Sequence, residues 1–417
     1  MGEIIAAFDI GSSKTAAVIG ETDKRNGVLK ILGVGQSPCN GVIKGLISDV
    51  EDTAKSIISA LNQAENMADI NHIDYTAAAI PGGIASLVRD ENVMAISNPD
   101  KGISQTDVDK LVRSFRLKQV PLGEEIIAIL PIHYLLDSYD EVKEPVGMVA
   151  SELGLEAKVA LVPEIAAHNL RKAVEMAGIT LPMITLEPIA SASIVLSNDE
   201  KERGVALVDV GAGITDISVF NDGNLIYTSI IPVGGGHITN DIALGFRLTF
   251  NEAEEIKKKY AQAMEAWIEE DMEIPATNMD DESIIISQKE VAYIVEARIQ
   301  EIFSLVRKNL EDSGYIDKIP AGIVLSGGGL SLLKGAKELG RSVLEMPIRT
   351  GAPDIIGLSN PTFSVSVGLA VYASGGAKQI DFIMNQRENE HKKGRNAASA
   401  WDGIKKAFNN FFNGKKF

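Results

Sequence analysis

The chain has 417 residues, 45% of them apolar and 23% charged, which is typical of a globular protein of two to four domains and excludes a disordered or collagen-like chain. Its one cysteine, Cys39, excludes an internal disulfide. The net charge of -17 divides into +6 on residues 391–417, with seven basic residues and one acid, and -23 on residues 1–390, which argues against a nucleic-acid partner.

The N-terminal segment predicts strands and one helix. It has no basic region before its first acid, so we expect no signal peptide. No apolar run approaches the ~18–20 residues that span a bilayer, so we expect a cytoplasmic protein. Apolar residues at helical spacing predict a helix over Asp49–Ala68, and a strand over Tyr75–Ile80 follows and ends at Pro81.

Residues 84–162 predict a compact α/β insertion. Its expected elements are strands at Ile84–Arg89 and Asn92–Ile96, a helix near Thr106–Phe115, and strands at Glu125–Leu136 and Leu153–Leu161.

The rest of the chain predicts a return to the first lobe and then a second lobe. A helix from Pro163 to about Ala177, a strand over Met183–Leu186 and a helix from Pro188 come first. Residues 237–314 are expected to be mostly helical, with acidic stretches at 265–273 and 280–282 that are typical of solvated faces. Asn360 and Pro361 open the last core helix, which reaches Ser374.

An internal repeat at a spacing of 200 residues aligns residues 6–15 with 206–215. Each copy predicts an apolar strand, an aspartate, a turn of small residues and a second strand. Both second strands lead to hairpin turns, at Asn26-Gly27 and Asp222-Gly223.

The two small-residue turns suit a polyphosphate. Such turns expose several backbone N–H groups, which together bind an anion, so one turn from each half would hold a polyphosphate from both sides. Asp9 and Asp209 beside them suit a hydrated magnesium ion. The alternative is that both are plain hairpin turns of a duplicated sheet.

Two triple glycines complete the pattern. Gly327–Gly329 follow a buried strand and would let an adenine or ribose approach the backbone. Gly234–Gly236 precede a helical pattern, so a phosphate could bind at that helix start. A structural turn or helix cap would explain either one as well.

These motifs, with Leu186–Ala190 and Ser364–Ala370, resemble the actin and sugar-kinase ATPase superfamily, where they are called phosphate 1, connect 1, phosphate 2, adenosine and connect 2. The resemblance implies α/β architecture with a duplicated, ribonuclease-H-like, two-lobed fold, and ATP with Mg²⁺ as cofactors. It implies phosphate contacts from Gly11, Ser12, Ser13, Lys14, Gly211, Ala212, Gly213, Thr215, Gly235 and Gly236, nucleoside contacts from Gly327, Gly328, Gly329, Glu254 and Lys257, and Mg²⁺ at Asp9 and Asp209, through water.

Two of the implied roles have plain alternatives. Glu254 and Lys257 could instead be a solvated i,i+3 pair. Glu187, at the end of its strand, is the candidate to position water against the γ-phosphate, and could instead only hydrogen-bond a loop.

Within the superfamily, the sequence resembles the FtsA family of bacterial cell-division proteins, which anchor FtsZ filaments to the membrane. The wording of Asp9–Lys14 and Ile231–Asp241, the place of the insertion and the C-terminal helix carry this resemblance. It implies a slow ATPase at most, a location at the division septum, the FtsZ C-terminal peptide on subdomain 2B, self-association through subdomain 1C, and later divisome proteins as further partners.

The expected domain organisation has six parts. They are lobe 1 (1–83 with 163–202 and 360–384), subdomain 1C (84–162), lobe 2 (203–236 with 315–359), subdomain 2B (237–314), a flexible linker (385–399) and an amphipathic helix (400–417).

The C-terminal segment predicts a membrane contact. Five of its residues from 401 to 417 are aromatic, in a chain with 5% aromatics. On a helical wheel its apolar residues fall within an arc of ~140°, which suits a membrane interface, and the alternative is a helix that docks on the protein itself. The residues expected to bind anionic lipid are Trp401, Ile404, Lys405, Lys406, Phe408, Phe411 and Phe412.

The sequence alone leaves other functions of the same fold as alternatives. A metabolite kinase would need a general-base aspartate in a sugar pocket, which the sequence does not identify, and would have no use for the tail. A PilM-type pilus assembly protein lacks such a tail, and a DnaK-type chaperone would need a substrate-binding domain.

Overall fold

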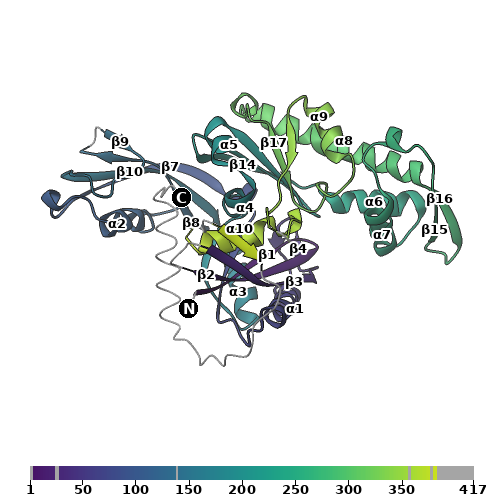
Figure 1. Cartoon of the computed structure of the whole chain (residues 1–417), viewed down its shortest axis with the longest axis horizontal. Coiled ribbons are helices and arrows are strands. Elements are labelled where there is room, and N and C mark those ends of the chain that lie inside the picture. The colour runs from purple at the N-terminus through teal and green to yellow at the C-terminus, as the bar shows by residue number, and fades with distance from the viewer. Residues whose placement is uncertain (1–2, 24–27, 138–139, 356–357, 376–378, 383–417) are drawn as a thin grey trace.

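The computed structural model describes residues 3–23, 28–137, 140–355, 358–375 and 379–382. Two similar sheets form its two lobes (Figure 1). In each sheet three strands form an antiparallel meander, and two further strands add in parallel beside the first of them. This common order confirms the duplication expected from the 200-residue repeat.

The strands of the first sheet lie in the order β11-β6-β1-β2-β3-β19, and those of the second in the order β14-β13-β12-β17-β18. Their bounds are β1 (Glu3–Ile10), β2 (Lys14–Asp23), β3 (Val28–Pro38), β6 (Tyr75–Ile80), β11 (Thr180–Leu186), β19 (Gln379–Phe382), β12 (Val205–Val210), β13 (Thr215–Asn221), β14 (Asn224–Ile231), β17 (Ile323–Ser326) and β18 (Ile348–Thr350).

Helices cover the first sheet at close range. Helix α1 (Val50–Ala68) begins after Asp49, whose side chain accepts the Asp52 N–H, and packs on β2 and β3. A Cβ on Gly33 or Gly35 would collide with carbonyl oxygens of α1, so only glycine permits this approach. Helices α3 (Glu164–Met176), α4 (Glu187–Val195) and α10 (Ser364–Ala373) complete the lobe, and α4 packs against α10 near the centre of the molecule (Figure 1).

The predicted insertion forms a separate sheet of order β7-β10-β8-β9, covered by α2 (Gln105–Phe115). Its strands are β7 (Ser86–Ala95), β8 (Glu124–Leu136), β9 (Asp140–Val142) and β10 (Glu152–Pro163). The two strands predicted at Ile84–Arg89 and Asn92–Ile96 are one strand, because all ten residues of β7 pair with β10 in an unbroken register.

The second lobe carries α6 (Gly235–Phe246), α7 (Phe250–Tyr260) and α8 (Gln288–Asp312), so the expectation that 237–314 is mostly helical is confirmed. The segment also holds a hairpin of β15 (Glu273–Thr277) and β16 (Ser283–Ser287), which the sequence analysis missed. The first acidic stretch leads into β15, and the second lies in its turn, where the Asn278 side chain accepts the Asp280 and Glu282 N–H groups.

The remaining described elements are short. They are β4 (Val42–Ile43), β5 (Leu46–Ile47), α5 (Asn198–Arg203), α9 (Ala336–Leu344) and the 3-10 helices η1 (Gly82–Ile84), η2 (Pro99–Lys101), η3 (Glu265–Trp267), η4 (Ile316–Lys318) and η5 (Pro361–Phe363). In the described part of the chain, no helix combines the length and apolar character needed to cross a bilayer.

Candidate functional site

The two small-residue turns have the same geometry and face each other across the lobes. The Gly11 N–H donates to the Lys14 carbonyl at 2.9 Å, and the Gly211 N–H donates to the Ile214 carbonyl at 2.9 Å. A Cβ on Gly213 would lie 2.8 Å from Ser12 Oγ, so the turns are in contact. Among the described residues no partner is found for four amides that the turns contain, those of Ser12, Ser13, Ala212 and Gly213. Unpaired amides on two turns that meet, one from each lobe, suit an anion with several phosphates.

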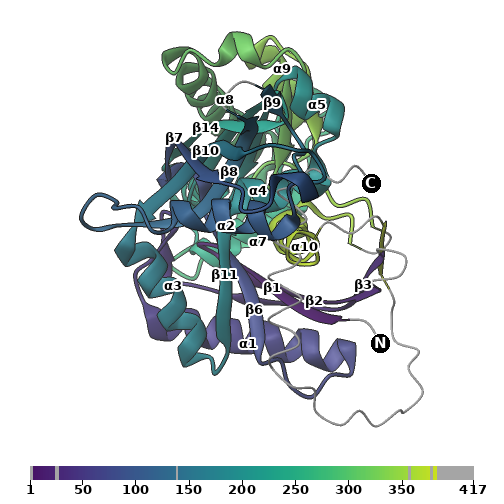
Figure 2. The same ribbon diagram turned by 90° about the vertical axis from the view of Figure 1, so that its left-hand side faces the viewer.

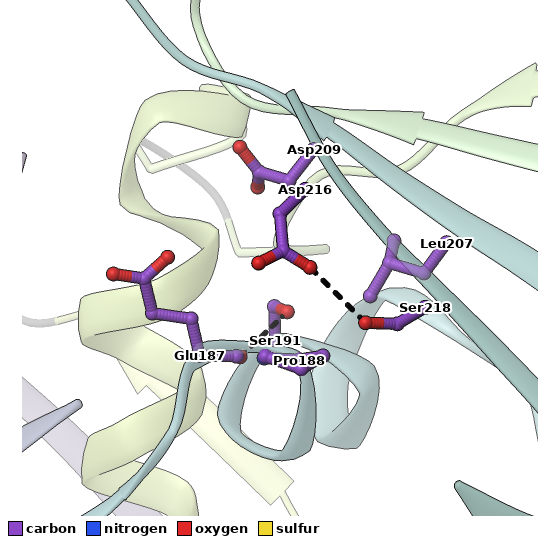
Figure 3. Close-up of a pocket in the computed structure, with 7 residues that line it drawn as sticks. All are labelled: Glu187, Pro188, Ser191, Leu207, Asp209, Asp216 and Ser218. Carbon is purple, nitrogen blue, oxygen red and sulfur yellow. Dashed lines mark hydrogen bonds between the residues drawn. The ribbon is translucent and has the colours of Figure 1, made fainter. Parts of the chain in front are cut away.

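Carboxylates gather beside these turns. Glu187 begins α4, Asp209 lies near the end of β12, and Asp216 pairs directly with Asp209 in the β12–β13 register. Figure 3 shows the small pocket lined by these three residues with Pro188, Ser191, Leu207 and Ser218. Asp9 occupies the position of Asp209 in the first repeat.

Asp216 is a site residue that the sequence analysis missed. Ala16 holds its place in the first repeat, since Asp9 pairs with Ala16 as Asp209 pairs with Asp216. The sequence did contain a signal for it, because one copy of the repeat has an aspartate where the other has a small apolar residue. Asp216 is 4% exposed, and its carboxylate accepts hydrogen bonds from Ser218 Oγ at 3.2 Å and from the Gly83 N–H at 2.8 Å.

The cluster holds more acidic side chains than the neighbouring cationic side chains can neutralise. Burial raises the pKa of Asp9 and of Asp216 to about 6, and Lys14 opposes the shift at Asp9. Burial, and then Asp9 and Asp216, raise the pKa of Asp209 to about 7. Burial, and then the three aspartates, raise the pKa of Glu187 well above its usual range. A bound cation would therefore be stabilised here.

We expect this cluster to make the nucleotide-free protein less stable as the pH rises. The pKa of Asp209 is raised from 3.8 to about 7, so the folded state binds more protons than the unfolded state between these values. Its unfavourable contribution is absent below pH 3.8 and complete above about pH 7. Asp209→Asn should therefore raise the free energy of unfolding at pH 8, by up to about 4 kcal/mol, with little effect at pH 4.

Chemical denaturation in a chelator, without nucleotide, measures this difference. Asp222→Asn is the matched control, because Asp222 lies on the exposed β13–β14 turn and should change neither value. An equal effect of Asp209→Asn at both pH values would contradict the expected linkage.

The donor set fits magnesium held mainly by phosphate and water. In the described segments, no three His, Cys, Asp or Glu side chains converge as direct metal ligands. Mg²⁺ is commonly bound through one or two carboxylates together with water and substrate phosphates, and Asp9 and Asp209 supply such carboxylates beside the open amides of the turns.

The triple glycines are packed against the second turn. The Gly235 and Gly236 N–H groups donate to the carbonyls of Gly211 and Ala212, each at 2.8 Å, so these amides already have partners. A Cβ on Gly235 would lie 2.7 Å from Gly329 Cα. Close packing of the two glycine segments, the structural alternative, therefore explains why glycine stands at these positions. The nucleotide contacts of Gly235, Gly236 and Gly327–Gly329 stay predictions.

The phosphate contact of Thr215 stays a prediction, although its hydroxyl already has a partner in the protein. Its side chain is fully buried, and its hydroxyl donates to the Val233 carbonyl at 2.8 Å. The alternation of the strand turns this residue into the core, as it does Thr15 in the first repeat.

Lys14 and Lys257 both bond to backbone carbonyls of segments near the turns. Lys14 Nζ donates to the Thr362 carbonyl at 3.5 Å, which links the first turn to η5. Lys257 is 8% exposed and donates to the Gly235 carbonyl at 3.0 Å and to Thr239 Oγ1 at 2.7 Å, while it pairs with Glu254 at 2.7 Å. The alternative of a solvated pair is therefore wrong, and contact of Glu254 and Lys257 with a nucleoside stays a prediction.

Comparison with known proteins decides the family. Cell division protein FtsA of Pseudomonas aeruginosa is 38% identical over 389 residues, which cover 91% of each chain. The chain belongs to the FtsA family. FtsA of Bacillus subtilis is 35% identical over 378 residues, covering 90% of this chain and 84% of the relative. The family model described as cell division protein FtsA matches residues 206–368, and the model described as the SHS2 domain inserted in FtsA matches residues 82–161.

Solved structures confirm the fold-class prediction. The PilM-PilN type IV pilus biogenesis complex matches with a TM-score of 0.61 and 17% identity, over 88% of this chain and 97% of that one. MreB5 of Spiroplasma citri bound to ADP matches with a TM-score of 0.55 and 16% identity, over 89% and 96%. This FtsA-family chain therefore has an actin-like fold with an inserted SHS2 subdomain.

The predicted membrane residues of this FtsA-family chain lie outside the described residues. They are Trp401, Ile404, Lys405, Lys406, Phe408, Phe411 and Phe412, and the predicted linker 385–399 lies outside as well.

Proposed function

We propose that the chain is an ATP-binding actin-like cell-division protein that polymerises on the inner face of the membrane and tethers FtsZ filaments there. The single observation that carries this proposal is the 38% identity to an FtsA over 91% of both chains. The proposed location is the division septum, where the chain would also recruit later divisome proteins.

We expect ATP to bind at the two turns, each of which has two open backbone amides. The open amides of Ser12 and Ser13, on one lobe, and of Ala212 and Gly213, on the other, would hold phosphate oxygens. Bound ATP with Mg²⁺ would supply the anion and the cation that these amides and the neighbouring carboxylates lack. Because the donors come from both lobes, the nucleotide would act chiefly as a clamp that favours one arrangement of the lobes.

Slow hydrolysis is consistent with the state of Glu187. Burial raises its pKa well above the usual range, so the nucleotide-free carboxyl keeps its proton to a higher pH than an exposed glutamate does. A cation near Asp209 would oppose that shift and let Glu187 accept a proton from water.

Exposed apolar side chains on residues 237–314 support a peptide-binding role for that subdomain. Large apolar side chains that stay exposed commonly mark interaction sites. Those of this subdomain are Leu244, Phe250, Trp267, Met272, Met279, Ile285 and Tyr293. We propose this region as the site of the FtsZ C-terminal peptide.

Self-association is proposed through the inserted subdomain. Its strand β7 is an edge strand, paired only with β10 among the described residues, and exposes Val88 and Val93. An open edge can pair with a neighbouring copy.

A lipid monolayer with and without ATP tests the clamp. We expect ATP with Mg²⁺ to increase filament length and number several-fold over the nucleotide-free protein, as seen by electron microscopy of negatively stained monolayers. Gly213→Val is the matched variant, since its side chain would collide with Ser12 and keep the turns apart. Filaments of equal number and length with and without ATP would show that the clamp role is wrong.

A further inference from the structure

The inserted subdomain is joined to the rest of the chain through η1 before β7 and through the step from β10 to α3, and η1 lies against the second lobe. A Cβ on Gly83 would lie 2.5 Å from the Ile230 nitrogen of β14. A Cβ on Gly82 would lie 2.6 Å from Thr228 Oγ1 and 2.6 Å from Pro188 Cγ. The strand β14 also lies beside β7 and β8 of the insertion (Figure 2). The backbone of η1 therefore packs closely against β14 and Pro188.

Asp216 reaches this entrance from inside the pocket. Its Oδ2 accepts the Gly83 N–H at 2.8 Å, a hydrogen bond between residues 133 positions apart, while its Oδ1 accepts the Ser218 hydroxyl at 3.2 Å. The same side chain lines the pocket with Glu187 and Asp209 (Figure 3). Since the first repeat has Ala16 at this place, the hairpin itself does not require an aspartate.

A second link between insertion and lobe lies outside the pocket. Lys158 of β10 donates from Nζ to the Ile226 carbonyl of β14 at 2.9 Å. The insertion thus contacts the second lobe at Asp216 of β13 and at the Ile226 carbonyl of β14, and of these two contacts the one at Asp216 borders the pocket.

We infer that Asp216 is a positioning residue that couples the contents of the cleft to the placement of the inserted subdomain. A cation or phosphate that enters beside Asp209 and Glu187 changes the field at the Asp216 carboxylate. Because the Gly83 N–H donates to this carboxylate, a shift of the carboxylate would be passed to Gly83 and to the start of β7. The inference depends on the proposed nucleotide binding in one respect, the identity of the ligand.

Hydrogen exchange of the full chain, followed by mass spectrometry with and without Mg²⁺ and AMPPNP, tests this link. Asp216→Ala removes the acceptor, and we expect exchange in residues 82–95 to rise about tenfold without nucleotide and the nucleotide-dependent change there to disappear. Asp216→Asn keeps an oxygen acceptor and should retain most of the protection at Gly83. Lys158→Met breaks the other link and should preserve the nucleotide-dependent change in residues 82–95.

Two outcomes overturn the inference. One is an Asp216→Ala chain that binds AMPPNP and still shows the wild-type change in residues 82–95. The other is unchanged exchange of these residues in nucleotide-free Asp216→Ala. Binding of a fluorescent nucleotide is measured separately. A wild-type chain that binds none refutes the proposed ATP role. Hydrogen exchange of the two Asp216 variants without nucleotide then still decides whether the link between Asp216 and Gly83 exists.

Discussion

A chain that ends at Ser399 is expected to lose its binding to anionic vesicles almost completely. The deleted segment contains five aromatic side chains and the cations Lys405 and Lys406. Each cation near an anionic leaflet contributes about 1 kcal/mol, so this pair alone accounts for more than a tenfold difference in affinity. Burial of the aromatic face adds to it, and the chain that remains, at -20 over residues 1–399, is repelled by the same surface.

Flotation of vesicles with and without anionic lipid measures this loss. A full chain with Lys405→Gln and Lys406→Gln is the matched control, since it keeps every aromatic residue. Its binding should fall at least tenfold on anionic vesicles and become less sensitive to salt. If the chain ending at Ser399 floats as well as the full chain, the segment is not the membrane contact and a helix docked on the protein is the better explanation.

Gly327→Ala is expected to destabilise the protein strongly, by about 3 kcal/mol or more. Gly327 has a φ of +77°, which L-residues other than glycine adopt only at a cost. A methyl group there would also collide with the Asp209 carboxylate and lie 2.5 Å from the Val210 carbonyl oxygen. The collision is with backbone at the end of a central strand, which cannot move without disturbing the second turn.

Gly314→Ala separates the two causes. Gly314 has a φ of +71°, and no atom lies within 4 Å of the added methyl group, so only the backbone strain of about 1 kcal/mol applies. Chemical denaturation of both variants gives the difference. Equal losses would mean that close packing of the glycine segment on β12 contributes nothing.

The lobes could be predicted from sequence because their signals are local. The repeated order of strand, aspartate, small-residue turn and strand lies within ten residues of each copy, and Asp222 and Gly223 have the positive φ angles that a hairpin signal predicts. The helix over residues 49–68 was equally clear, since its cap and its apolar spacing agree.

The errors involve contacts between distant segments. The strands β15 and β16 have five residues each, and Pro275 and the acidic neighbours hide the alternation that places Ile274 and Ile286 in the core. The role of Asp216 follows from the contact between β13 and η1, which the sequence does not show. The burial of Lys257 likewise follows from the contact between α7 and the start of α6. The bond from the Thr215 hydroxyl to the Val233 carbonyl could not be foreseen either, because it joins residues 18 positions apart.

The most direct test of the account is co-flotation of FtsZ with vesicles of anionic lipid. With the full chain and ATP, the account predicts that FtsZ floats with the vesicles, and that it stays in solution when the chain ends at Ser399 or when FtsZ lacks its C-terminal peptide. FtsZ that remains in solution although the full chain is on the vesicles would contradict the proposed tether.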